Sequence, residues 1–165
     1  MGHAETQTSP KHNEKTNFHV RPCQPQDLQT VLKIAEKYTS FDVTPTLADI
    51  EGLYSRNPEY FYVAEVDAKK IIGFITGYEK TGIPEQVLSK WNARRVGYVD
   101  LMAVEQQSRR QGVGEALIRK LLDDFRKYGL DTVNLDVPTT QTEAVKLYEK
   151  HGFNIRSHSM TKRLV

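Results

Sequence analysis

The chain has 165 residues, enough for one domain with a buried core and too few to require two. Its 23 lysine and arginine residues nearly balance 21 acidic ones, so the net charge of +2 gives no support to a nucleic-acid or membrane partner. The single cysteine, Cys23, excludes an intramolecular disulfide and any multi-cysteine metal site. No apolar run approaches the roughly 20 residues that a membrane span needs. We therefore expect a protein of the cytoplasm.

The first segment of the chain differs from the rest in composition. Residues 1–17 carry almost no large apolar side chains, so they cannot bury enough surface to offset the entropy lost on ordering. We expect a disordered N-terminal tail over 1–17 and one folded domain over 18–165.

Apolar spacing and turn residues predict a mixed α/β domain, with helices covering a central sheet. Asp27 is the expected N-cap of the first helix, and Gly129 is expected to end the long third one. The expected buried stripe of that third helix consists of Leu117, Ile118, Leu121, Leu122 and Phe125. The segment 79–95 is polar and lacks a clear period. In chain order we expect a strand at 18–23, helices at 27–38 and 47–55, a hairpin of strands at 60–66 and 71–79, an irregular segment at 79–95, a central strand at 96–104, a helix ending at 129, a strand at 132–137, a helix at 142–152, and short strands at 153–155 and 160–165.

The sequence RRQGVG, residues 109–114, stands immediately before the strongest helical pattern of the chain. A helix start carries unpaired N–H groups and a partial positive charge, and glycines allow a bulky anion to approach them. Arg109 and Arg110 add positive charge. The junction therefore suits a phosphate or pyrophosphate, although a turn with solvated arginines would use the same residues. It matches neither the Rossmann nor the Walker A pattern.

The context of this junction resembles the GNAT superfamily of acetyl-CoA-dependent N-acetyltransferases. Its RxxGxG motif is met at Arg109, Gly112 and Gly114. A second motif, a small residue followed by Leu-Tyr and Gly-Phe, is met by residues 144, 147–148 and 152–153. The resemblance covers residues 18–165. It implies the GNAT fold, an α/β (α+β) arrangement in which about four helices flank a mixed, mostly antiparallel sheet.

The resemblance also implies where acetyl-CoA binds. The pyrophosphate is expected on the RRQGVG loop, and the pantetheine arm is expected beside the end of the central strand. Gln141 stands where the family commonly has an asparagine that contacts the pantetheine. The cofactor-binding residues implied are Met102, Ala103, Val104, Arg109, Arg110, Gln111, Gly112, Val113, Gly114 and Gln141.

Three residues are candidates for proton transfer. Tyr148 matches the family's usual general acid, a phenol that protonates the departing thiolate. Asp136 matches the position of a catalytic glutamate in the GNAT subgroup that acetylates ribosomal-protein N-termini, and Asp100 is an acid inside an otherwise apolar strand. Either acid fits a general base, and either fits a hydrogen-bonded structural carboxylate. Each candidate thus has a structural alternative, and for Tyr148 it is packing on the sheet.

The acceptor amine stays open in the sequence: a protein lysine, a protein N-terminus or a small amine all fit. No histidine pair has a zinc spacing, so we expect no metal. A coenzyme A-binding regulatory domain without turnover is the alternative function. The family's members often form dimers, so both a homodimer and a monomer remain compatible with the resemblance.

Overall fold

The computed structural model of the chain describes residues 17–39 and 44–164. Apart from Asn17, the expected N-terminal tail lies outside the described residues.

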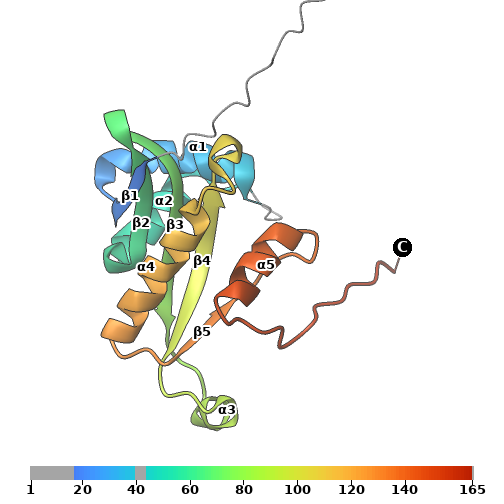
Figure 1. The fold of residues 1–165 in the computed structure, drawn as a ribbon. Helices are drawn as coiled ribbons and strands as arrows, with labels where there is room; N and C mark the ends of the chain where they lie inside the picture. Colours follow the sequence, from blue (N-terminus) through green and yellow to red (C-terminus); the bar gives the residue numbers. More distant parts are fainter. Residues whose placement is uncertain (1–16, 40–43, 165) are drawn as a thin grey trace, which may run out of the picture.

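One sheet of five strands forms the centre of the protein, and its strands follow one another in chain order (Figure 1). Neighbouring strands are antiparallel except for the last pair, which is parallel. The expected mixed, mostly antiparallel sheet is therefore confirmed. The strands are β1 (Phe18–Pro22), β2 (Phe61–Val66), β3 (Lys70–Lys80), β4 (Val96–Val104) and β5 (Thr132–Leu135).

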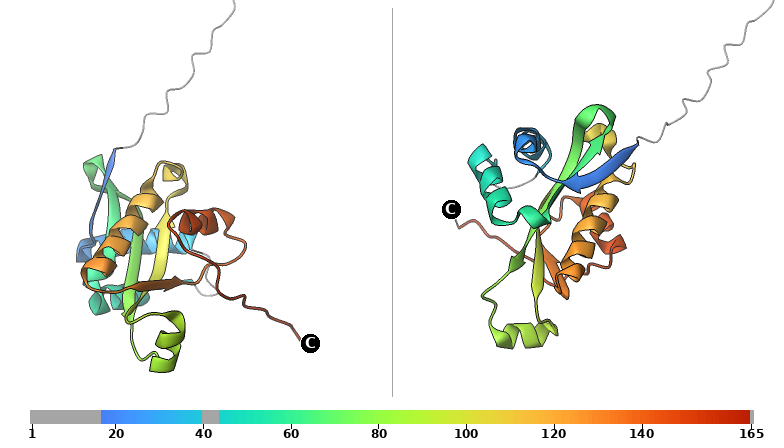
Figure 2. Two further views of the ribbon diagram at one scale, coloured as in Figure 1. Left: turned by 60° about the horizontal axis from the view of Figure 1, so that its bottom comes forward. Right: turned by 90° about the vertical axis from the view of Figure 1, so that its left-hand side faces the viewer.

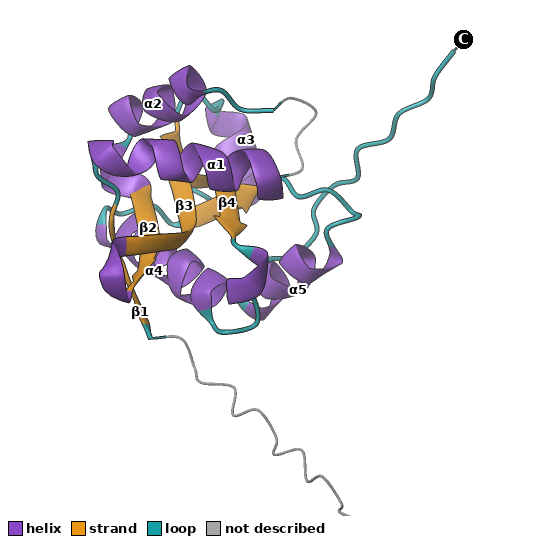
Figure 3. Cartoon of the chain, turned by 90° about the horizontal axis from the view of Figure 1, so that it is seen from above, coloured by secondary structure: helices purple, strands orange, loops and turns teal. Residues whose placement is uncertain are grey.

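Helices cover both faces of this sheet, which gives the three layers visible in Figures 2 and 3. The first two helices pack on one face and bury a cluster around Val31, Ile50 and Phe74. Two later helices lie on the other face, where α4 contributes six buried residues to a second cluster. The helices are α1 (Leu28–Tyr38), α2 (Leu47–Arg56), α3 (Glu85–Trp91), α4 (Val113–Lys127) and α5 (Thr142–Lys150).

Helix α4 lies close to the sheet because glycines face it. A Cβ atom on Gly97 would lie 2.8 Å from the ring of Phe125, which is completely buried. The predicted apolar stripe of this helix is confirmed, and Gly129 follows its end with a φ of 81°. The contact between Gly97 and Phe125 joins the start of β4 to the C-terminal half of α4. At the other end, a Cβ atom on Gly73 would lie 3.2 Å from the side chain of Val104 and 3.4 Å from that of Leu117, so the first half of α4 also packs closely beside the end of β4, where the site described below lies.

Two irregularities of β4 shape its C-terminal half. The register between β3 and β4 shifts where Gly77 pairs with Val99 and Thr76 pairs with Leu101, which leaves Asp100 as a bulge. On the other side, the last pair between β4 and β5 is Val99 with Leu135. Beyond this pair β4 continues beside β3 alone, and the two parallel strands separate as a fork.

Three sequence expectations are wrong. The segment 79–95 is not irregular throughout, because it contains α3, whose Trp91 stacks on Arg156 at 4.4 Å. The two C-terminal strands are absent, and residues 153–164 form no regular element within the described chain. Their larger apolar side chains, Ile155, Met160 and Leu164, are too few and too unevenly spaced to form a buried strand face, and they are exposed by 67%, 92% and 85%.

Asp27 is the third correction, because its side chain does not cap α1. It accepts hydrogen bonds from the backbone N–H of Gln24 at 2.8 Å and from Arg21 at 2.6 Å and 3.0 Å. Arg21 also binds Glu65, so the two acids and the arginine join β1, β2 and the start of α1. The carboxylate supports the start of the helix through this network.

Candidate functional site

The RRQGVG loop ends in an open helix N-terminus. Gly112 precedes α4 with a φ of 85°, a left-handed conformation that suits glycine. The first hydrogen bond of the helix joins the N–H of Ala116 to the carbonyl of Gly112, so the three N–H groups of residues 113–115 precede it. A Cβ atom on Gly112 would meet nothing within 4 Å. A phosphate can therefore reach these donors, and the dipole of α4 favours it.

Gly114 serves a different purpose from Gly112. A Cβ atom here would lie 3.1 Å from Cδ2 of Leu147 in α5 and 3.9 Å from the side chain of Val104. The glycine lets α5 pack against the start of α4, beside the fork. The two glycines of this short motif are thus needed for different reasons. Gly112 keeps the anion site open, and Gly114 allows the two helices to pack closely.

The side chains of the two arginines point to different elements. The Nε of Arg109 donates to the carbonyl of Val104 at 3.1 Å, and its guanidinium lies 5.1 Å from the ring centre of Tyr38. Arg109 thereby links the end of α1 to the end of β4. Arg110 reaches the start of α5, where its Nη1 lies 2.7 Å from Oε2 of Glu143. This second arginine is 83% exposed and can turn toward an anion at the helix start.

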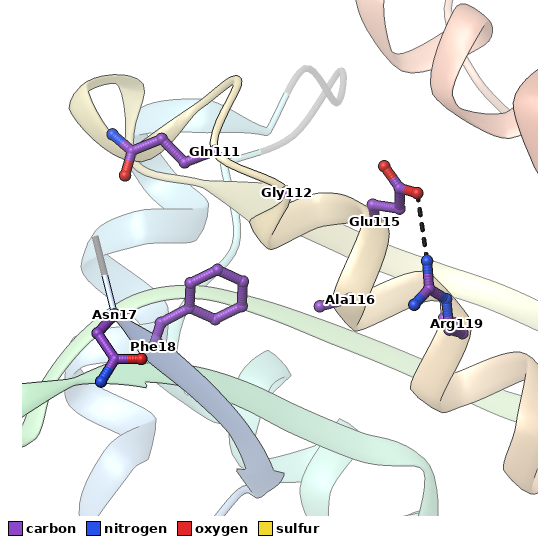
Figure 4. Close-up of a pocket in the computed structure, with 7 residues that line it drawn as sticks. All are labelled: Asn17, Phe18, Gln111, Gly112, Glu115, Ala116 and Arg119. Carbon is purple, nitrogen blue, oxygen red and sulfur yellow. Dashed lines mark hydrogen bonds and ion pairs between the residues drawn. The ribbon is translucent and has the colours of Figure 1, made fainter. Parts of the chain in front are cut away.

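A hollow of about 630 Å³ adjoins the helix start on the side of β1 (Figure 4). Gln111 donates to the carbonyl of Gln107 at 3.1 Å, whereas its Oε1 atom is buried without a partner among the described residues. None of the candidate catalytic residues lines the hollow. Its lining residues are Asn17, Phe18, Gln111, Gly112, Glu115, Ala116 and Arg119.

The remaining cofactor candidates line the fork. Met102, Ala103 and Val104 pair with β3 on one side, and their other side faces the space left by β5. Gln141 lies directly before α5, and its backbone N–H donates to the carbonyl of Pro138. The fork and the helix start are neighbours, so the backbone edge and the anion donors form one continuous surface.

Tyr148 approaches this surface from α5. Its ring packs edge-on against Phe153 at 5.6 Å, next to the core cluster on the α4 face that includes Met102 and Val104. Burial raises the pKa of Tyr148 to about 12. The phenol therefore keeps its proton at neutral pH and can donate it.

Asp136 follows the last residue of β5 and accepts a hydrogen bond from the hydroxyl of Tyr98 at 2.5 Å. Burial, followed by this bond, raises the pKa of Tyr98, so its phenol stays a donor. Sequence reasoning missed Tyr98. Its position two residues before Asp100 in the same strand was the available signal, since alternate residues share a face.

Asp100, the bulge residue, is half-buried. Burial raises its pKa, and the charge of Arg56 at the end of α2 opposes this shift. Both acids also contribute to raising the pKa values of Tyr78 and Tyr98, after the larger effect of burial. The structure thus brings Asp100, Asp136 and two tyrosines together, whereas Tyr148 belongs to the cluster on the α4 face.

Neither a metal-binding cluster nor a membrane-spanning helix occurs in residues 17–39 and 44–164. No group of three metal-binding side chains occurs in these ranges. None of the helices there is long and apolar enough to cross a membrane.

Comparisons with known proteins agree with this geometry. The "[Ribosomal protein bS18]-alanine N-acetyltransferase" of Escherichia coli (strain K12) is 42% identical over 53 residues, which is 32% of this chain and 36% of that protein's length. The "N-alpha-acetyltransferase" of Sulfurisphaera tokodaii is 27% identical over 142 residues, covering 82% of this chain and 80% of that protein. The crystal structure of Ard1 from Thermoplasma volcanium superimposes with a TM-score of 0.71 at 32% identity, over 85% of this chain and 84% of that one.

The family comparison covers most of the described domain. Residues 28–153 match the family described as "Acetyltransferase (GNAT) family", and this range includes the RRQGVG loop, the fork and Tyr148. The chain belongs to the GNAT acetyltransferase family.

Proposed function

We propose that the chain transfers an acetyl group from acetyl-CoA to a primary amine by direct attack of the amine on the thioester. The single observation that supports this most is the junction of an open helix N-terminus with a strand whose backbone edge is left free by the fork. An anion and an extended chain can bind there side by side.

The residues around this junction fit acetyl-CoA. The N–H groups at the start of α4 and the side chain of Arg110 would hold the pyrophosphate, and residues 102–104 would bind the pantetheine amides through their backbone. The bound co-substrate supplies an activated acetyl group on a thiol leaving group. No Cβ atom obstructs the approach at Gly112, and this observation supports the fit.

Proton transfer is divided between the two sides of the fork. Asp136, with one oxygen fixed by Tyr98, is placed to accept a proton from the attacking amine, directly or through a water. Tyr148, protonated at neutral pH, would donate to the departing thiolate. A base and an acid on different elements can act in sequence without neutralising each other.

We propose the N-terminal α-amine of a peptide as the acceptor. A relative that aligns with 82% of this chain is named an N-alpha-acetyltransferase, and this likeness supports the choice over a lysine side chain or a small amine. We also propose that the domain extends over residues 18–165 and that the enzyme acts in the cytoplasm without a metal. Whether the enzyme is a monomer or a homodimer is measured separately, by its molar mass in solution.

The test is release of thiol from acetyl-CoA in the presence of lysine-containing peptides with free N-termini, the same peptides blocked by N-terminal acetylation, and small diamines. We expect release with free peptides only, and a loss of at least tenfold in kcat for Asp136→Asn. Turnover with blocked lysine peptides or with diamines would reassign the acceptor. Binding of acetyl-CoA without turnover on any amine would instead identify a coenzyme A-binding regulatory domain.

A further inference from the structure

Asp100 occupies a special position at the apex of the fork. It is the extra residue of the bulge in β4, and it follows directly after Val99, the last residue that pairs with β5. Asp136 occupies the equivalent position on β5, directly after Leu135. Bulges commonly redirect a side chain beside an active site. The two acids are thus the first residues beyond the apex, one on each strand.

The surroundings of the two carboxylates differ. Asp136 receives the Tyr98 hydroxyl. Asp100 makes no hydrogen bond or ion pair with any residue in the described part of the chain, although it is half-buried. The charge of Arg56 acts on it without forming an ion pair and lowers its pKa, against the larger effect of burial.

A partly desolvated carboxylate without a partner is unfavourable unless a ligand completes it. Tyr98 and Asp100 are alternate residues of β4, and alternate side chains of a strand share a face, so Asp100 lies on the face where the Tyr98–Asp136 pair lies. In agreement with this position, the charge of Asp100 contributes to raising the pKa values of Tyr78 and Tyr98, after the larger effect of burial. A cation that enters the fork from this face can therefore reach Asp100. The proposed acetyl-CoA surface consists of the backbone edge of β4 and the start of α4, so it does not include the Asp100 side chain. A cation bound to Asp100 would therefore belong to the acceptor.

We propose that Asp100 selects the acceptor by binding a second positive charge on it, so that the preferred substrate is a peptide with a basic side chain next to its N-terminal amine. This inference rests on the proposed N-terminal acetyltransferase function.

The second charge suits the chemistry better than the reacting amine itself does. An ammonium held between two carboxylates would keep its proton, since both charges favour the protonated form. A separate guanidinium or ammonium paired with Asp100 leaves Asp136 to accept the proton from the reacting amine. The same neighbouring positive charge lowers the pKa of that amine and favours its neutral, nucleophilic form.

The experiment compares peptides that differ only in the second residue: arginine, alanine or glutamate. Arginine avoids a competing side-chain amine. For the unsubstituted enzyme we expect kcat/KM to be at least tenfold higher for the arginine peptide than for the glutamate peptide. Asp100→Asn should reduce this ratio to about threefold or less. Arg56→Gln should increase the ratio about twofold, because it removes a competing cation.

Asp123→Asn is the matched control, because it removes one exposed negative charge from α4, away from the fork. The ratio of kcat/KM for the arginine peptide to that for the glutamate peptide should be the same in this variant as in the unsubstituted enzyme. A ratio near one in the unsubstituted enzyme, or a ratio that Asp100→Asn preserves, would overturn the inference while leaving the acetyltransferase function intact. Absence of turnover on every peptide would overturn the proposed function and this inference with it. Asp100→Glu should restore part of the preference, which a merely structural role would not do.

Discussion

The packing of Tyr148 raises the pKa of a phenol that is already protonated at neutral pH. Burial against Phe153 and the α4-side cluster raises its pKa to about 12, so the phenol is a proton source and not a base at neutral pH. Asp136 is held by Tyr98 on the other side of the fork. These environments suit the proposed roles of Tyr148 as proton donor and Asp136 as proton acceptor.

Tyr148→Phe keeps the ring and its packing but removes the proton. We expect kcat to fall at least tenfold, about 1.4 kcal/mol in the barrier, with the Kd for acetyl-CoA unchanged. Steady-state thiol release and calorimetric binding provide the two values. Full turnover in this variant would show that the tyrosine only packs.

Residue-level predictability was uneven. Motif spacing located Arg109, Gly112 and Tyr148, but the separate reasons for Gly112 and Gly114 depend on φ and on the approach of Leu147. Tyr98 was missed because its role depends on a contact across strands, with Asp136 on a neighbouring strand 38 positions away in sequence. Such contacts are set by register, which a strand pattern does not specify.

At the scale of elements, the Arg21 network fastens the edge of the sheet. Arg21 binds Asp27 and Glu65, whose side chains are only 6% and 12% exposed. Burial pushes the pKa of Asp27 up, but the hydrogen bonds from Arg21 and the Gln24 N–H outweigh it and lower the pKa below its ordinary value of 3.8. The stability that this group adds is therefore present above about pH 4 and is lost as the pH falls.

Arg21→Met should cost about 2–3 kcal/mol of unfolding free energy at pH 7, because it leaves two buried acids unpaired. The difference from the unsubstituted protein should shrink below about pH 4, where Asp27 becomes protonated. Urea unfolding at both pH values measures this. Arg126→Met, which breaks an exposed pair on α4, is the control and should cost at most about 0.5 kcal/mol. A pH-independent difference would contradict the role of Asp27.

Glu143 links α5 to the anion site by competing for Arg110. Removing its charge frees the guanidinium for a phosphate, so Glu143→Gln should lower the Kd for acetyl-CoA about two- to fourfold, the range of an exposed ion pair. Glu149→Gln, on the same helix, should leave the Kd unchanged. Weaker binding in Glu143→Gln would mean that the pair holds Arg110 in place for the ligand.

Elements with a strong period were the most predictable. The stripe of α4 was found because five apolar residues recur at helical spacing, and all five are buried. Helix α3 was missed because none of its residues is buried, so burial imposes no apolar period on it. The C-terminal strands were expected from a few apolar residues near the end of the chain, and this segment buries too little surface to form them.

At the scale of the whole molecule, the proposed site is built on a strand inside the sheet and on the helix that covers it. Strand β4 lies between β3 and β5, and α4 packs across its face. The described C-terminal residues after Phe153 lie outside this arrangement and are exposed. The core and the site therefore depend little on that segment.

Deletion of residues 159–165 should leave the melting temperature within about 2 °C, since surface residues that bury little contribute little. Thermal melting by circular dichroism measures this. Deletion of residues 153–165 should lower the melting temperature by clearly more than 2 °C, because it also removes Phe153, which packs against Tyr148. Equal effects of the two deletions would contradict the anchoring role of Phe153.

The central claim is that the start of α4 and the fork bind acetyl-CoA, and a calorimetric titration with Gly112→Glu tests it most directly. This substitution places a side chain and a negative charge where a Cβ atom would otherwise meet nothing within 4 Å. Gly112→Ala is its control, since it shares the strain of a positive φ without the charge. We predict that acetyl-CoA binds the unsubstituted protein, binds Gly112→Ala more weakly, and does not bind Gly112→Glu. Undiminished binding by Gly112→Glu would contradict the account.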